Sequence, residues 1–117
     1  MCKEISGRSI VFEVEENALA EFLAGDFDGI NVTIPYKQDI TAHLEEVCGD
    51  ALDFNAVNTV VCKTKKGYNA DGVGLMLMLK SAGVCLKGQK ALVLGAGGAG
   101  RSTALAFKNA GAEVFLY

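Results

Sequence analysis

Apolar positions change their spacing along the chain, and the changes predict short strands alternating with helices. Residues 9–14 predict a strand, and Asn17 is placed to cap a helix with Leu19, Phe22 and Leu23 on its apolar face. The β-branched segment 29–35 predicts a second strand, closed by Pro35, the only proline. Residues 39–47 predict a helix, because three apolar side chains recur at i, i+4 and i+7: Ile40, Leu44 and Val47.

The second half of the chain continues this alternation. Residues 56–62 predict a buried strand, and the polar, basic turn 63–67 then reverses the chain at Tyr68 and Asn69. A helix over 73–81, opened by Asp71 or Gly72, is apolar on nearly all sides, so we expect it to be buried between layers.

A break in the apolar pattern at residues 83–90 separates this part from a second unit. After it come a strand at 91–94, a glycine-rich loop at 95–100, a helix at 101–109, a stop at Gly111 and a strand at 113–117. The order of elements predicts an α/β protein in two parts, residues 1–86 and residues 87–117.

Composition places the chain among globular proteins and excludes several functional classes. Half of its 117 residues are hydrophobic and the formal net charge is −3, which excludes a disordered chain. The sequence pI of about 5.1 argues against nucleic acid as a partner. Neither a membrane-spanning stretch nor an export signal is visible, so we expect a cytoplasmic protein with no membrane partner.

Histidine and cysteine usage argues against a metal site and against triad hydrolysis. His43 is the only histidine, and we expect it to face solvent from a helix. The four cysteines, at positions 2, 48, 62 and 85, match neither a redox pair nor the spacing of zinc ligands. We therefore expect reduced, mostly structural thiols.

The glycine-rich loop matches the G-x-G-x-x-G pattern, and it stands between a predicted strand and a predicted helix, as this pattern requires. Gly95 suits the tight turn, Gly97 allows the backbone to approach a pyrophosphate, and Gly100 allows close packing of helix on strand. The sequence therefore predicts a dinucleotide site formed by Gly95, Ala96, Gly97, Gly98, Ala99 and Gly100, with Arg101 as a further candidate for phosphate contact. A ligand-free glycine turn and a solvated Arg101 remain the structural alternatives.

Three longer motifs resemble the shikimate dehydrogenase family. The family pattern G-x-N-V-T-I-P-x-K is complete at residues 29–37, A-V-N-T stands at 56–59, and G-A-G-G-A stands at 95–99. The resemblance covers the chain from about Phe12 onward. It implies a substrate domain with a mainly parallel sheet flanked by helices, followed by the start of a Rossmann-type nucleotide-binding domain. It also implies NADPH-dependent reduction of 3-dehydroshikimate, a small-molecule substrate of aromatic amino-acid biosynthesis.

The resemblance also implies roles for four side chains. Lys37 and Asp71 correspond to the family's catalytic pair, and Thr33 and Asn58 to positions that bind substrate hydroxyls. An ammonium beside a carboxylate suits the chemistry, because hydride transfer to a carbonyl carbon requires proton transfer to its oxygen. On the residues alone, a surface lysine, a helix-capping Asp71 and strand-end turn residues are simpler interpretations. We expect Tyr36 and Tyr68 to be packing residues.

The chain departs from the family pattern in three places. The family's Ser-x-Ser-Pro segment, which grips the substrate carboxylate, is absent, and its N-T-D-G motif reads Asn69-Ala70-Asp71-Gly72 here. Nothing of the family's later strands follows Tyr117. Residues 91–117 fall short of one βαβ unit of about 30 residues. We therefore expect a truncated chain with little turnover, which self-associates through residues 114–117 if it folds alone.

Two other functions stay open at this point. The chain could be a catalytically dead binding or assembly module, as the missing segments suggest. It could also belong to a quinate/shikimate dehydrogenase that prefers NAD, because the turn that selects the cofactor lies about 20 residues beyond the loop.

Overall fold

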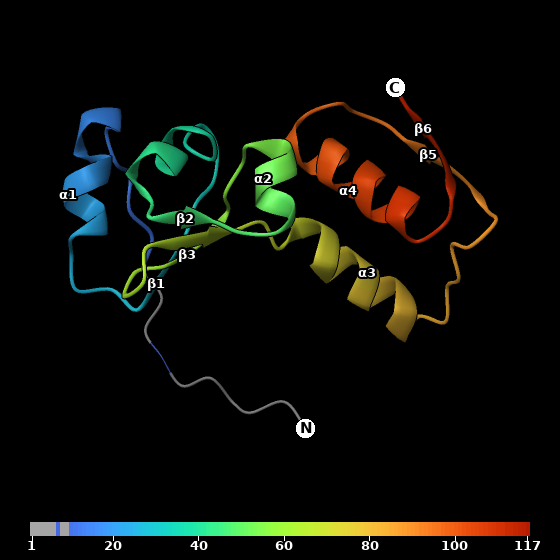
Figure 1. The fold of residues 1–117 in the computed structure, drawn as a ribbon, viewed down its shortest axis with the longest axis horizontal. Coiled ribbons are helices and arrows are strands. Elements are labelled where there is room, and N and C mark those ends of the chain that lie inside the picture. The colour runs from blue at the N-terminus through green and yellow to red at the C-terminus, as the bar shows by residue number, and fades with distance from the viewer. Residues whose placement is uncertain (1–6, 8–9) are drawn as a thin grey trace.

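The computed structural model describes Gly7 and residues 10–117, in which short helices and strands form an α/β arrangement (Figure 1). In chain order the elements are η1 (Glu16–Ala18), α1 (Leu19–Leu23), β1 (Gly29–Asn31), η2 (Asp39–His43), β2 (Glu46–Val47), α2 (Asp50–Phe54), β3 (Thr59–Val61), β4 (Lys66–Tyr68), α3 (Asp71–Ser81), β5 (Lys90–Val93), α4 (Gly98–Asn109) and β6 (Glu113–Leu116). The α/β class is confirmed.

The N-terminal part differs in two details from its prediction. Ser9 lies outside the described residues, and residues 10–14 form no strand. The helix around Leu19 is present, but Asn17 lies inside η1 and no side chain caps η1 or α1. Val11 is 93% exposed, and neither sheet includes a strand from the described segment before η1.

Four strands form the first sheet, in the order β1-β3-β4-β2. The β1–β3 and β3–β4 pairs are antiparallel, and only β2 and β4 run parallel. The expectation of a mainly parallel sheet is therefore wrong for the described strands, and the sheet is mixed. The reason is the predicted reversal at 63–67, where Lys65 takes φ +49 and donates its N–H to Cys62 O, closing β3 and β4 into a hairpin.

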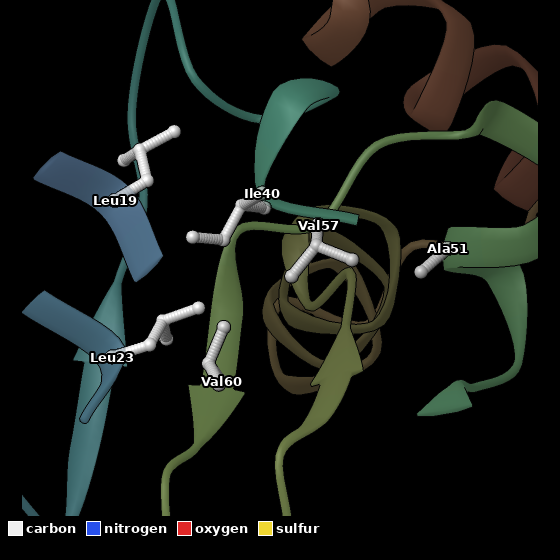
Figure 2. Close-up of a cluster of buried hydrophobic side chains, with 6 residues drawn as sticks. All are labelled: Leu19, Leu23, Ile40, Ala51, Val57 and Val60. Carbon is white, nitrogen blue, oxygen red and sulfur yellow. The ribbon is translucent and has the colours of Figure 1, made fainter. Parts of the chain in front are cut away.

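A small apolar core lies between this sheet and the helices beside it (Figure 2). Its buried members come from five parts of the chain: Leu19, Leu23, Ile40, Ala51, Val57 and Val60. Gly67 is required where β4 passes the core, because a Cβ there would overlap Leu44 and lie 2.8 Å from Val57. The core holds β3 and β4 in place, and their ends carry the polar residues described below.

The predicted helix over 39–47 is only partly correct. A 3-10 turn, η2, ends at His43, Leu44 is extended, and Glu46 and Val47 pair with β4. Backbone pairing with β4 competes with the helix, and Lys66 adds an ion pair of 2.5 Å to Glu46. The three apolar side chains that suggested one helical face still meet the core, but from different elements.

Helix α3 is present as predicted, yet it is not buried between layers. Only Gly72 is buried, whereas Val73, Leu77 and Met78 are 54%, 61% and 59% exposed. The helix packs on α4 through Gly72, where an added Cβ would lie 3.2 Å from Ser102 Oγ. No other described element covers its apolar side, so the pattern predicted the helix correctly and its surroundings incorrectly.

The second unit follows its prediction closely. Strands β5 and β6 pair in parallel, with Leu92 opposite Phe115, and α4 connects them. One face of this pair packs on α4, whereas Leu92 and Phe115 are 63% and 48% exposed on the other. This is the uncovered apolar face expected of two strands with one helix.

The exposure of the single histidine, of two tyrosines and of the cysteines bears on the roles predicted for them. His43 is exposed and Tyr36 packs against the core, whereas Tyr68 is 38% exposed and lies outside the core cluster. Cys48, Cys62 and Cys85 are free thiols, and Cys2 lies outside the described residues. Within residues 10–117 no helix is long and apolar enough to cross a bilayer, and no cluster of side chains is arranged to hold a metal ion.

Candidate active site

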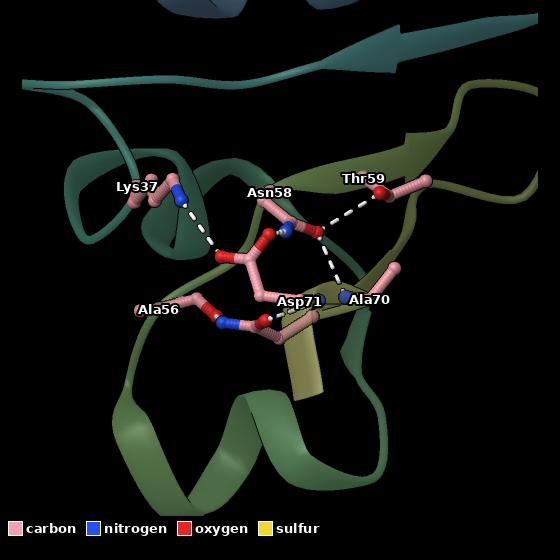
Figure 3. A network of polar contacts seen from close by, with 7 residues as sticks. Lys37, Ala56, Asn58, Thr59, Ala70 and Asp71 are labelled. Carbon is pink, nitrogen blue, oxygen red and sulfur yellow. Dashed lines mark hydrogen bonds and ion pairs between the residues drawn. The ribbon is translucent and has the colours of Figure 1, made fainter. Parts of the chain in front are cut away.

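Lys37 and Asp71 meet although 34 positions separate them in the sequence. The Lys37 Nζ lies 3.1 Å from Asp71 Oδ2, and the two side chains are 22% and 37% exposed (Figure 3). The contact places a proton-donating ammonium beside a carboxylate at a partly open site. The sequence-predicted pair is therefore brought together, and its side chains are less exposed than those of the Lys66–Glu46 and Lys90–Glu113 ion pairs.

The turn before η2 positions Lys37. After β1 the chain turns through residues 33–37, where Tyr36 donates its N–H to Thr33 O. The Lys37 carbonyl then accepts a 2.7 Å hydrogen bond from the N–H of Val57, which is fully buried in the core. This bond fixes the backbone from which the ammonium extends.

Asn58 completes a network around the carboxylate. Its Nδ2 donates to Asp71 Oδ1 at 2.7 Å, so that each carboxylate oxygen of Asp71 has one donor. The backbone of Asn58 is held between two strands, because its N–H donates to Tyr68 O and its carbonyl accepts from Val32 N–H. A buried core therefore determines where the amide meets the acid.

Asn69 supports the position of Asp71 from the other side. It is 7% exposed, donates from Nδ2 to Ala56 O at 3.1 Å, and accepts the Asp71 N–H at Oδ1, also at 3.1 Å. This Asx turn satisfies the first N–H of α3. The Asp71 side chain does not cap α3, so the capping interpretation of Asp71 is wrong.

A cavity of about 350 Å³ adjoins this network. All four predicted substrate-site residues line it, with Thr33 exposed at its rim: Thr33, Lys37, Asn58 and Asp71. Asn31, Val32, Thr59 and Ala70 complete the lining. The site presents an ammonium, an amide and a carboxylate to its contents, which suits a ligand carrying hydroxyl or carbonyl oxygens.

The glycine loop has the geometry that its pattern requires. Gly95 takes φ +103, which only glycine adopts without strain, and a Cβ on Gly100 would overlap the Gly95 carbonyl oxygen. Nothing lies within 4 Å of a Cβ on Gly97 or Gly98, so the backbone there is open to an approaching group. Helix α4 begins at Gly98, inside the loop and earlier than predicted.

Arg101 folds back onto the same loop. Its Nε donates to Ala96 O at 2.9 Å, and the residue is exposed. The guanidinium therefore lies at the loop with further N–H groups available, so Arg101 can contact a phosphate bound there.

Sequence reasoning missed two residues of the polar network, Thr59 and Asn69. Thr59 Oγ1 lies 2.9 Å from Asn58 Oδ1, and Asn69 forms the Asx turn described above. Both stand inside motifs already singled out, so the signal was their adjacency to Asn58 and Asp71.

Comparisons with known proteins agree with these motifs. The model of the shikimate dehydrogenase substrate-binding domain matches residues 3–60. The shikimate dehydrogenase (NADP(+)) of Carboxydothermus hydrogenoformans is 44% identical over 110 residues, covering 89% of this chain and 39% of that protein. The corresponding Thermus thermophilus protein is 46% identical over 93 residues, covering 78% of this chain and 35% of that one. The chain thus spans less than half the length of these curated relatives.

Solved structures show the same likeness. Shikimate 5-dehydrogenase from Thermus thermophilus in complex with shikimate has a TM-score of 0.79 at 39% identity, over 90% of this chain and 42% of that one. The ligand-free 5-ketofructose reductase of a Gluconobacter strain has a TM-score of 0.80 at 30% identity, over 90% and 40%. The matched domain model, the curated relatives and the solved structures agree, and the chain belongs to the shikimate dehydrogenase family.

Proposed function

We propose that this chain carries the substrate pocket and proton-transfer pair of an NADPH-dependent shikimate dehydrogenase, with the first part of its nucleotide site. The observation that supports this most directly is the Lys37–Asp71–Asn58 network lining one cavity. We further propose that the substrate part spans residues 1–86 and the nucleotide part residues 87–117. The relatives whose names state the activity are more than twice as long, so the proposal concerns the whole protein.

The proposed reaction reduces the ketone of 3-dehydroshikimate to the alcohol of shikimate. Lys37 donates a proton to the carbonyl oxygen as the carbonyl carbon receives hydride, and the resulting amine regains its proton from solvent. Asp71 holds the ammonium in place and accepts a hydrogen bond from a substrate hydroxyl. Asn58 and Thr33 orient the ring through its hydroxyl oxygens.

The residues of the glycine loop fit a dinucleotide. NADPH, when bound, supplies the hydride and leaves as NADP⁺. The loop from Gly95 to Gly100 would hold the pyrophosphate on the open backbone at Gly97 and Gly98, and Arg101 would contact a phosphate. A relative in the same family has been solved in complex with NADP(H) and shikimate, which supports this choice of ligands.

The test is binding of shikimate and of NADPH to the 117-residue chain, measured separately by titration calorimetry. Binding is the appropriate readout because, among the described residues, the nucleotide unit consists of a two-stranded sheet with one helix. We expect saturable shikimate binding, weakened by at least about tenfold in Lys37→Ala, since a charge-assisted hydrogen bond contributes about 1.5–3 kcal/mol.

Lys66→Ala is the matched control, because Lys66 also pairs with a carboxylate but does not line the cavity. It should leave shikimate affinity unchanged. Absence of binding to the unmodified chain, with its fold intact, would count against the proposal and for an assembly module. NAD bound as tightly as NADPH would favour the quinate/shikimate alternative.

A second candidate substrate follows from one structural relative. The similarity to 5-ketofructose reductase, at a TM-score of 0.80, favours another polyhydroxylated ketone as the ligand of the same cavity. Titration with 5-ketofructose distinguishes the two candidates, because the tighter ligand identifies the substrate class.

A further inference from the structure

The orientation of the Asn58 amide follows from the chemistry of its neighbours. The backbone N–H of Ala70 points to one end of the amide, at 3.0 Å, and a backbone N–H can only donate. The end that receives it is therefore the oxygen, Oδ1. The nitrogen, Nδ2, must then face the Asp71 carboxylate, at 2.7 Å (Figure 3).

Thr59 supplies the second donor to the same oxygen. Its Oγ1 lies 2.9 Å from Asn58 Oδ1, and the hydroxyl must donate because an amide oxygen only accepts. Together with the Ala70 N–H, this bond occupies both lone pairs of Oδ1. Within residues 10–117, Asp71 is the acceptor that the Asn58 amide nitrogen reaches, so one N–H is left for a ligand.

We propose that Thr59 is a positioning residue that acts through Asn58. Its hydroxyl holds the amide so that the nitrogen faces Asp71 and the remaining N–H is offered to the cavity. Because no lone pair of Oδ1 remains, Asn58 can only donate to a ligand. The ligand group bound at Asn58 must therefore be an acceptor oxygen, which restricts how a polyhydroxylated ring can lie in the cavity.

Thr59→Val tests the hydroxyl, because valine keeps the shape and the preference for a strand. The readout is solvent exchange of the Asn58 side-chain amide protons, followed by NMR on the 117-residue chain. We expect exchange to be about three- to tenfold faster in Thr59→Val, as the loss of one net hydrogen bond predicts. Thr59→Ser keeps the hydroxyl and should restore the original rate.

Backbone amides of β3 serve as the internal reference. A merely structural effect would speed exchange at Val60 and Val61 as much as at the Asn58 side chain, and that result would overturn the proposal. So would an unchanged Asn58 rate in Thr59→Val, or a serine variant that behaves like valine. Should Thr59→Val not fold, Thr59→Ala removes the same hydroxyl and is judged by the same criteria.

The effect on ligand affinity rests on the proposed function, whereas the exchange measurement does not. We expect shikimate to bind about three- to tenfold more weakly to Thr59→Val and normally to Thr59→Ser. An unmodified chain that binds no shikimate would contradict the proposed function, and the exchange rates would still decide the role of Thr59. Equal affinity of the valine variant, with faster exchange, would overturn the consequence for the ligand.

Discussion

At the scale of single residues, the Lys37–Asp71 ion pair contributes little to stability, although many hydrogen bonds hold its two residues in place. An ion pair this exposed adds about 0–1 kcal/mol, after the cost of ordering two side chains. Yet backbone hydrogen bonds and two asparagine amides hold its parts in place. This much support for a weakly stabilising contact fits a site that must be ready for a ligand.

The free thiols should differ in reactivity according to their surroundings. Burial, assisted by the negative charge of Asp28, raises the pKa of the Cys62 thiol, whereas Cys85 is exposed. At pH 8 we expect iodoacetamide to modify Cys62 more than about tenfold more slowly than Cys85, because each 1.4 kcal/mol of opening free energy is a factor of ten. Mass spectrometry of the digested chain measures both rates.

The same shift gives a pH dependence. The folded chain holds the Cys62 proton more tightly than the unfolded chain, so this contribution to stability is full below the unfolded pKa of about 9 and is lost as the pH rises through the folded pKa.

Unfolding in urea is the control for the labelling experiment, because Cys62 and Cys85 should then react with iodoacetamide at similar rates. Rapid modification of Cys62 in the folded chain would show that the core around it is open.

How far the site could be predicted differs from residue to residue. Lys37, Asn58 and Asp71 stand in recognisable motifs, and the structure places them together. Thr59 reaches the Asn58 side chain because the backbone N–H of Asn58 is bonded to Tyr68 O in the neighbouring strand. Asn69 reaches the Asp71 N–H because its own amide is anchored on Ala56 O. Those contacts depend on the packing of strands, which neither motif shows.

Among the elements, the β5–α4 turn gives the sharpest contrast between two glycines. Gly100 lies where a Cβ would overlap the Gly95 carbonyl oxygen, and Gly97 lies where nothing comes within 4 Å. One glycine is thus required by the packing of helix on strand. The other is open for a ligand, as the dinucleotide pattern demands.

Gly100→Ala should therefore lower the free energy of unfolding by about 1–3 kcal/mol, because the helix must move away from the strand. Gly97→Ala is the matched control and should change it by less than about 0.5 kcal/mol, while weakening NADPH binding. Urea unfolding followed by circular dichroism measures the first effect and calorimetry the second. Equal stability losses in both variants would contradict this division of roles.

The apolar pattern predicted the elements of the second unit well. Helix α4 and strands β5 and β6 match their predictions closely, but residues 44–47 leave the helical pattern because β4 offers backbone partners there. The five-residue helix α2 was not predicted, since so short a helix depends on its contacts. Tertiary pairing, which a period does not encode, decides such segments.

At the scale of the whole molecule, the two-stranded sheet of β5 and β6 has an exposed apolar face. Leu92 of β5 and Phe115 of β6 are 63% and 48% exposed, and Leu94 and Tyr117, directly after these strands, are 75% and 89% exposed. Both outer strand edges also lack partners among the described residues. Soluble monomers rarely expose contiguous patches of this kind, and open strand edges favour pairing with another chain.

The 117-residue chain should therefore self-associate through the exposed face of β5 and β6. Phe115→Lys adds a charge opposite Leu92, so it should shift the chain toward monomer at the same concentration in sedimentation velocity. Val11→Lys is the control, because it adds the same charge at an exposed apolar residue outside both sheets. If Val11→Lys dissociates the chain as strongly as Phe115→Lys, net charge rather than this face governs association. If the unmodified chain is already a monomer, the prediction of self-association is wrong.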